Sequence, residues 1–329
     1  MGAYILRRLL LIIPTLIGIM VVNFTLTQFV PGGPIEQIAA QVRGEGDVMG
    51  NLSGATADSA EQLAGDSGYE GARGLPPEFI AQLEREFGFD KPPVERFLSM
   101  MWNYVRFDFG VSWFRSISVM DLVVEKMPVS ITLGLWSTLI AYLISIPLGI
   151  AKATRDGTRF DTWTSGVIIM AYAIPAFLFA VVLMVLFAGG SYWQIFPLRG
   201  LTSDNFADLS VWGKVKDYAW HATLPVIAAT ISSFATLTLL TKNSFLDEIN
   251  KQYVMTARAK GLTERRVLYG HVFRNAMLIV IAGFPAMFLG VFFGSSILIE
   301  TIFSLDGLGR LGFEAAVQRD YPVIFGTLY

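Results

Sequence analysis

The residue types that most often carry out covalent or metal chemistry are scarce in this sequence. It contains no cysteine, which excludes disulfide bonds, thiol nucleophiles and thiolate metal ligands from the 329 residues. Its two histidines, His221 and His271, are too few for a histidine-rich metal site. No Ser-His-Asp set and no pair of carboxylates can be argued from the spacing of residues. We therefore predict no catalytic residue and no metal site.

A nucleotide-binding motif is also missing. A phosphate-binding loop reads G-x-x-x-x-G-K-[ST], whereas the only Gly-Lys step, Gly213-Lys214, is followed by valine and has no glycine at the required spacing. The formal net charge of −2 provides no basic excess for a nucleic-acid partner. If the protein uses ATP, we expect ATP and Mg²⁺ to be bound by a partner, with no cofactor on this chain.

The elements that must position any site are membrane helices. Hydrophobic residues make up 53% of the sequence and charged residues 16%, against about 25% charged residues in a soluble domain. A spanning helix needs roughly 20 apolar residues. Five nearly uncharged segments have that length: Leu9–Val30, Val129–Ala151, Ser165–Ala188, Ala222–Leu240 and Ala276–Ile299. We predict an all-α integral membrane protein of the bacterial inner membrane, surrounded by lipid.

Basic residues in the short loops predict the orientation, because such residues gather on the cytoplasmic side. Lys152, Arg155 and Arg159 follow the second span. The N-terminus is therefore expected in the cytoplasm. The first span is expected to stay uncleaved, since its apolar run exceeds that of a signal peptide. The loop after the fourth span is also rich in basic residues: Lys242, Lys251, Arg258, Lys260, Arg265, Arg266 and Arg274.

The loop after the first transmembrane helix (1–30) divides by composition. Residues 31–128 form the expected extracytoplasmic loop. Within it, residues 43–74 are rich in Gly, Ala, Ser and Asp and are expected to be flexible. Residues 76–127 contain Phe, Trp, Tyr and Leu with helical spacing and are expected to be ordered. Residues 129–329 then form the membrane core, with a cytoplasmic loop at 242–275.

The predicted spans carry no titratable residue near their centres. Such residues are costly inside a membrane and mark ion pathways, so the sequence gives little support to proton- or sodium-coupled transport. Glu300 lies at the outer margin of the fifth span, where we expect a solvated helix end.

The loop after the fourth span has the pattern of a helix–Gly–helix elbow. Residues 244–261 combine good helix formers with early acidic and late basic residues, and Gly261 suits a left-handed C-terminal turn. Thr263 is expected to cap a second helix. The small Ala257, Ala259 and Gly261 would let a partner approach closely, although the positive-inside rule alone explains the basic charges.

This elbow resembles the cytoplasmic EAA loop of binding-protein-dependent ABC importer permeases, and more narrowly that of the dipeptide and oligopeptide permeases. The resemblance lies in Tyr253–Leu262 and His271–Ala276, with Met255 in place of the usual acidic residue and no proline soon after Ala276. It extends along the chain through further motifs: Arg7-Arg8-Leu9, Pro31–Pro34, Phe87–Pro92, Asp108–Ser112, Ile146–Gly149, Tyr172–Pro175, Phe196–Gly200 and Phe303–Gly309.

The resemblance implies the transmembrane domain of a type I ABC importer. Such a subunit works with a second homologous permease, ABC ATPase subunits and an extracytoplasmic peptide-binding protein. A narrower likeness, supported by the Gly-rich insert, is to a branch associated with uptake of peptides and of microcin C, a peptide-nucleotide antibiotic. The elbow would sit in a cleft of the ATPase, which assigns coupling to Thr256, Ala257, Arg258, Ala259, Lys260, Gly261 and Leu262.

The residues along the substrate path are predicted less directly. Packing and lipid contact are common roles for aromatic residues in spans, and solvation is the ordinary state of a charge in a loop. Asp306 or Glu314 would hold the N-terminal amine of a peptide near the outer face. The aromatic residues that would face a central cavity are Trp136, Phe177, Phe179 and Phe288.

The family has six spans, and this sequence ends at Tyr329, where the sixth would begin. We expect a truncation, because half a span cannot satisfy its backbone groups in lipid. An ATP-independent channel, a secondary carrier, and an importer of nickel or oligosaccharides remain alternatives at this point.

Overall fold

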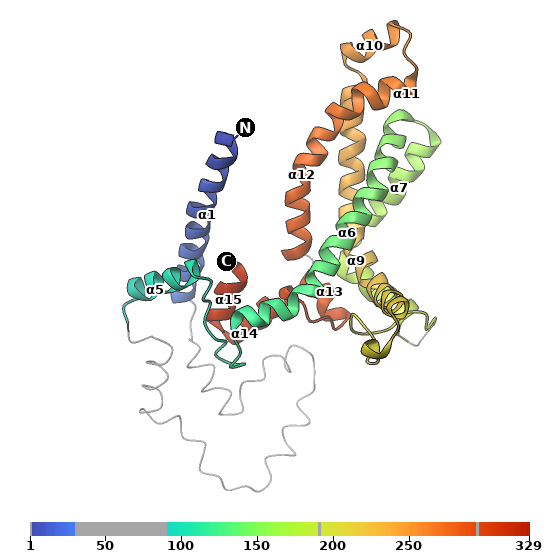
Figure 1. The fold of residues 1–329 in the computed structure, drawn as a ribbon. Coiled ribbons are helices and arrows are strands. Elements are labelled where there is room, and N and C mark those ends of the chain that lie inside the picture. The colour runs from blue at the N-terminus through green and yellow to red at the C-terminus, as the bar shows by residue number, and fades with distance from the viewer. Residues whose placement is uncertain (1, 30–90, 190–191, 294–295) are drawn as a thin grey trace. The chain divides into compact units, whose positions relative to one another are not determined.

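A computed structural model describes residues 2–29, 91–189, 192–293 and 296–329 of the protein (Figure 1). Helices dominate these ranges, and no β-strand forms within them. The predicted flexible segment at 43–74 lies outside the described residues. The helices are α1 (Gly2–Phe29), α5 (Pro93–Val105), α6 (Val119–Thr154), α7 (Arg159–Ala173), α8 (Ala176–Phe187), α9 (Val211–Ile249), α10 (Gln252–Ala259), α11 (Glu264–Val267), α12 (Phe273–Phe293), α13 (Ser296–Ile302), α14 (Leu308–Gln318) and α15 (Tyr321–Leu328).

Four helical segments in the described residues are long and apolar enough to cross a membrane. They are α1, α6, α9, and α11 continued into α12 through the π-helical turn Leu268–Val272. The bent pair of α7 and α8 makes a fifth if it is counted as one span. The predicted all-α, multi-spanning fold is confirmed, with different helix bounds.

The third predicted span is not one straight helix. α7 and α8 meet at an angle of 95°, and the break falls at Ile174 and Pro175. Ile174 adopts an extended backbone conformation (φ −81°, ψ 120°). Proline disfavours the helical conformation at the residue before it. The span expected over Ser165–Ala188 is therefore broken into two helices at this point.

The fourth span is longer than predicted. α9 has 39 residues, a length of about 58 Å at 1.5 Å per residue, well beyond a hydrocarbon core of about 30 Å. It runs to Ile249 and so includes the first residues of the expected elbow helix. The single helix predicted over 244–261 is wrong, because the chain leaves the helix at Asn250 and resumes it in α10.

The helices form two compact units, the first comprising Met1–Glu125 and Leu311–Tyr329. In this unit Met20, Tyr104 and Phe325 form a small buried cluster. A buried polar pair lies in the same unit, since the Ser112 hydroxyl donates to the Asp320 carboxylate. Of the predicted ordered part of the first loop, α5 and the segment leading to α6 are described.

The second unit, Lys126–Arg310, contains two hydrophobic clusters. One joins α8, α9 and α13, and the other joins the ends of α6 and α9 to α10 and α12. α6 and α9 cross closely at Gly149, where a Cβ atom would lie 2.6 Å from the Cβ of Thr241. α9 and α12 lie side by side, and α10 and α11 occupy one end (Figure 1).

Candidate functional site

The elbow is built around a left-handed glycine. α10 ends at Ala259, and Gly261 has φ +79°, a conformation that favours glycine because it lacks a Cβ. The Gly261 amide donates to the carbonyl of Arg258 at 2.9 Å. The predicted left-handed turn is confirmed, and it reverses the chain from α10 into α11.

The seven residues predicted to couple to an ATPase divide by exposure. Ala257 is only 6% exposed, and Leu262 is half-buried. The small side chain of Ala257 therefore packs within this chain, and its role in coupling stays a prediction. The residues of the set that present exposed side chains or backbone are Thr256, Arg258, Ala259, Lys260 and Gly261.

The inner side of α10 is fixed to the membrane helices. Val254 and Ala257 belong to the cluster that also contains Phe245 of α9 and Ala276 of α12. A movement imposed on α10 is therefore passed to α9 and α12 through close-packed side chains.

Tyr253 adds a polar link at the same place. Its hydroxyl donates to Glu248 of α9 at 2.6 Å and accepts from the Asn275 amide of α12 at 3.2 Å. Burial, and the hydrogen bond to Glu248, raise the pKa of Tyr253, so the hydroxyl keeps its proton at neutral pH. Sequence reasoning placed Tyr253 in the motif but gave it no role, because only the fold brings these partners together.

An exposed ion pair links the two arms of the elbow. The Arg258 guanidinium donates to both carboxylate oxygens of Glu264, at 2.8 and 3.0 Å. Thr263 is the residue immediately before α11, at the N-cap position, but its side chain makes no capping hydrogen bond. The predicted cap is therefore wrong in its chemistry, although α11 begins where it was expected.

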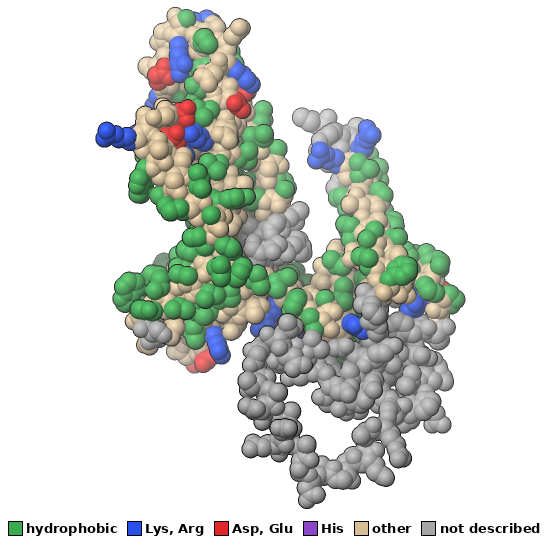
Figure 2. Space-filling view, turned by 180° about the vertical axis from the view of Figure 1, so that it is seen from behind, with side chains coloured by type: hydrophobic (Ala, Val, Ile, Leu, Met, Phe, Trp, Pro, Cys, Tyr) green, Lys and Arg blue, Asp and Glu red, His purple; other side chains and the backbone are tan. Residues whose placement is uncertain are grey.

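Charged side chains gather at the end of the second unit that carries α10 and α11, whereas hydrophobic side chains cover the helices away from it (Figure 2). Exposed apolar side chains also occur on the elbow, with Met255 57% and Tyr269 56% exposed. This mixture of apolar and basic groups on a protruding turn is typical of a protein-binding surface.

A buried charge network lies where α6 ends, α7 begins and the last third of α9 passes beside them. Lys152 has no exposed surface and is paired with Asp161 at 2.8 Å. It also donates to the hydroxyls of Thr164 and Ser165, both at 2.8 Å. Lys242 reaches Asp161 and Asp156, each at 2.8 Å.

The prediction that Lys152 is a loop charge was therefore wrong, and Lys242 is also largely buried. The signal in the sequence was the pair of acids, Asp156 and Asp161, placed among the basic residues of a short loop. A loop that only set topology would have no need of them.

Glu300 also differs from its prediction. It has no exposed surface, and its carboxylate accepts the backbone amide of Arg310 at 2.7 Å. The chain folds over it at Gly307, where a Cβ atom would collide with the carboxylate. The expected solvated helix end is wrong, because the segment between α13 and α14 covers this end of α13.

The carboxylates suggested for a peptide amine already have cationic partners. Asp306 is paired with Lys126, and Glu314 is paired with Arg115 at 2.6 Å. Glu314, whose side chain is 14% exposed, therefore departs from the expected solvated loop charge, whereas Asp306 is paired but stays 52% exposed.

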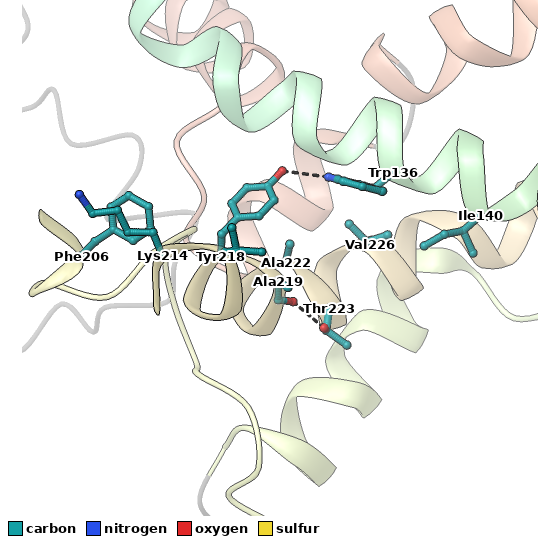
Figure 3. A pocket seen from close by; sticks show the side chains of 10 residues that line it. Trp136, Ile140, Phe206, Lys214, Tyr218, Ala219, Ala222, Thr223 and Val226 are labelled. Carbon is teal, nitrogen blue, oxygen red and sulfur yellow. Dashed lines mark hydrogen bonds between the residues drawn. The ribbon is translucent and has the colours of Figure 1, made fainter. Parts of the chain in front are cut away.

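The four aromatic residues predicted for the substrate path are not brought together in the described residues. Trp136 lines a pocket between α6 and α9, and its indole donates to the Tyr218 hydroxyl at 3.0 Å (Figure 3). Phe177 is exposed on α8, whereas Phe179 packs on the cluster of α8 and α9. Phe288 stacks on Phe284 within α12. Their role in transport stays a prediction.

The chain belongs to the family of binding-protein-dependent transport system inner membrane components, whose model matches residues 145–329. That range contains the elbow and the buried charge network. The protein is accordingly a multi-pass permease component of an ABC transport system in the inner membrane.

Its curated relatives are permease subunits. It is 63% identical to the peptidoglycan transport system permease protein YejB of Agrobacterium fabrum, over 100% of this chain and 92% of that protein. It is 59% identical to the inner membrane ABC transporter permease protein YejB of Escherichia coli O157:H7, over the same shares of the two chains. The dipeptide transport system permease protein DppB of Escherichia coli K12 is 32% identical, over 98% of this chain and 90% of its own.

Proposed function

We propose that this chain is one of two permease subunits of an ATP-driven importer of peptides, including peptides derived from peptidoglycan or resembling microcin C. The substrate class is supported by the names of its relatives, which describe transport of peptidoglycan and of dipeptides. The chain itself supplies no catalysis. ATP and Mg²⁺ are bound by ABC ATPase subunits, and an extracytoplasmic peptide-binding protein delivers the cargo.

The proposed ATPase-docking surface is the exposed side of the elbow, and this is the observation that carries the proposal. Its contact residues are Thr256, Arg258, Ala259, Lys260 and Gly261, with Leu262 at the edge. Ala257 belongs to the inner side, where its small size brings α10 close to α9 and α12. The open space around Gly261, with no atom within 4 Å of a Cβ built there, leaves room for a partner.

The orientation follows from the same assignment. The elbow and the N-terminus lie in the cytoplasm, in agreement with the concentration of Lys and Arg in the loops on that side. The connection between α8 and α9 lies on the opposite face.

Transport couples to ATP through rigid-body motion. When ATP closes the ATPase dimer, α10 moves with the surface to which it is docked, and its packed inner side carries α9 and α12. ATP drives the change only because the closed ATPase dimer binds one arrangement of the permeases better than the other.

The test is uptake of a labelled peptide in cells that contain the whole transporter. Gly261→Glu places a large anionic side chain at a left-handed position in the docking surface, and we expect uptake to fall to background. The matched control is Gly110→Glu, since Gly110 is also exposed, has φ +76° and has open space around it. Uptake that survives in Gly261→Glu, or that responds to an ion gradient and ignores ATP depletion, would contradict the proposal.

A further inference from the structure

A groove of about 610 Å³ lies between α6 and the first half of α9. Trp136 and Ile140 line it from α6, and a stretch of α9 from Lys214 to Val226 lines it from the other side. Phe206 and Lys214 stand at one end and Ile140 at the other (Figure 3). Both α6 and α9 are spanning helices by length and composition.

The polar groups in this groove are already satisfied within the chain. The Trp136 indole donates to the Tyr218 hydroxyl, which donates in turn to Thr132 at 2.8 Å. The Thr223 hydroxyl donates to the carbonyl of Ala219 in its own helix. A peptide backbone needs both donors and acceptors when it leaves water, and the donors of these groups are already used within the chain. An acyl chain needs only apolar surface.

Lys214 is the exception at the mouth of the groove. Its ammonium lies 5.7 Å from the centre of the Phe206 ring, and within the described residues it takes part in no ion pair. Trp212, which is 82% exposed, lies two residues before it. Exposed tryptophans next to lysines are typical of the boundary between acyl chains and headgroups.

We propose that this groove binds one anionic phospholipid, with an acyl chain along Trp136 and Ile140 and the headgroup phosphate against Lys214. A polar charged end and an apolar floor match the two halves of that ligand. The inference goes beyond the proposed function and does not depend on the cargo. It also gives Trp136 a role outside the substrate path.

The first experiment is native mass spectrometry of the whole transporter, purified in mild detergent with added phosphatidylglycerol. We expect Lys214→Met to lower retained phosphatidylglycerol about fivefold, the loss expected for one surface lysine, and Lys214→Arg to restore it. The control is Lys216→Met, because Lys216 is exposed on the same helix and does not line the groove. Equal retention in Lys214→Met and the unchanged protein would overturn the proposal.

A second experiment identifies the occupant without removing the lysine. A photo-crosslinking amino acid at Ala219, which lines the groove and is exposed, is activated in the intact complex. The proposal requires crosslinks to phospholipid. Crosslinks to the second permease, or to transported peptide, in place of lipid would each refute it.

Discussion

The elbow and the buried charge network use the same residue types in opposite ways. In the network Lys152 has no exposed surface, and its ammonium has carboxylate, hydroxyl and carbonyl partners within the chain. In the elbow, the paired side chains of Arg258 and Glu264 are 42% and 73% exposed. Charges of the first kind hold this chain's own helices together, whereas those of the second kind are available to another protein.

From this comparison we expect the largest effect for a variant of the buried network, and we expect it on the stability of the fold. Asp161→Ala would leave two cationic side chains, Lys152 and Lys242, without their shared buried carboxylate. We expect the free energy of unfolding to fall by about 3–5 kcal/mol, the usual cost of breaking a buried ion pair. Thermal unfolding of the purified protein in detergent measures it.

The control for that change is Asp156→Ala. The Asp156 side chain is 52% exposed and is paired with Lys242 alone, so we expect a loss of about 1 kcal/mol or less. Equal losses in the two variants would mean that burial does not separate the network from an ordinary surface pair.

The next effect is on transport with the fold intact. Gly261→Val forces a β-branched residue into the left-handed region, at a cost of about 1–2 kcal/mol or more. We expect peptide uptake to fall about fivefold to thirtyfold or more, since each 1.4 kcal/mol is a factor of ten. Gly261→Asn, a residue that tolerates this conformation, should retain most of the uptake. If Asn and Val behave alike, the backbone conformation is not what matters.

A smaller effect is expected where the elbow joins the membrane helices. Tyr253→Phe removes both hydrogen bonds of the hydroxyl but keeps the packed ring. Loss of these hydrogen bonds weakens the link between α10 and the membrane helices by about 1 kcal/mol. We therefore expect roughly fivefold less peptide transported per ATP hydrolysed by the reconstituted complex. Tyr192→Phe is the control, since Tyr192 is exposed and lies between α8 and α9, outside the elbow. An unchanged ratio in Tyr253→Phe would show that packing alone transmits the movement.

The smallest effect belongs to the exposed pair. Glu264→Gln removes a charge at the surface, where ion pairs contribute about 0–1 kcal/mol and are screened by salt. Uptake should change by about twofold or less. A loss as large as that of Gly261→Val would make the pair part of the docking contact itself.

Much of the fold follows from local pattern. The apolar runs are long enough to predict the spans found in the described residues, and the glycine after a helical stretch predicts the left-handed turn at Gly261. The bend at Pro175 did not follow, because other prolines lie inside helices without ending them. They are Pro14 in α1, Pro128 and Pro147 in α6, Pro225 in α9 and Pro285 in α12.

The sequence predicted where the candidate site lies along the chain, but not which of its side chains face inward and which are exposed. The sequence places Ala257 and Ala259 on one turn, and only the packing of α10 shows that Ala257 faces inward while Ala259 is exposed. Similarly, Lys152 and Glu300 lie at the ends of apolar runs, where exposure is the ordinary outcome. Their burial depends on side chains and backbone groups contributed by other helices and turns.

The central claim, that the exposed side of the elbow docks an ATPase, is tested most directly by purifying the tagged full-length protein in mild detergent and identifying its companions by mass spectrometry. We expect the second permease and the ATPase to accompany the unchanged protein and Gly110→Glu. Gly261→Glu should lose the ATPase and keep the second permease. Retention of the ATPase by Gly261→Glu, at the level of the unchanged protein, would contradict the account.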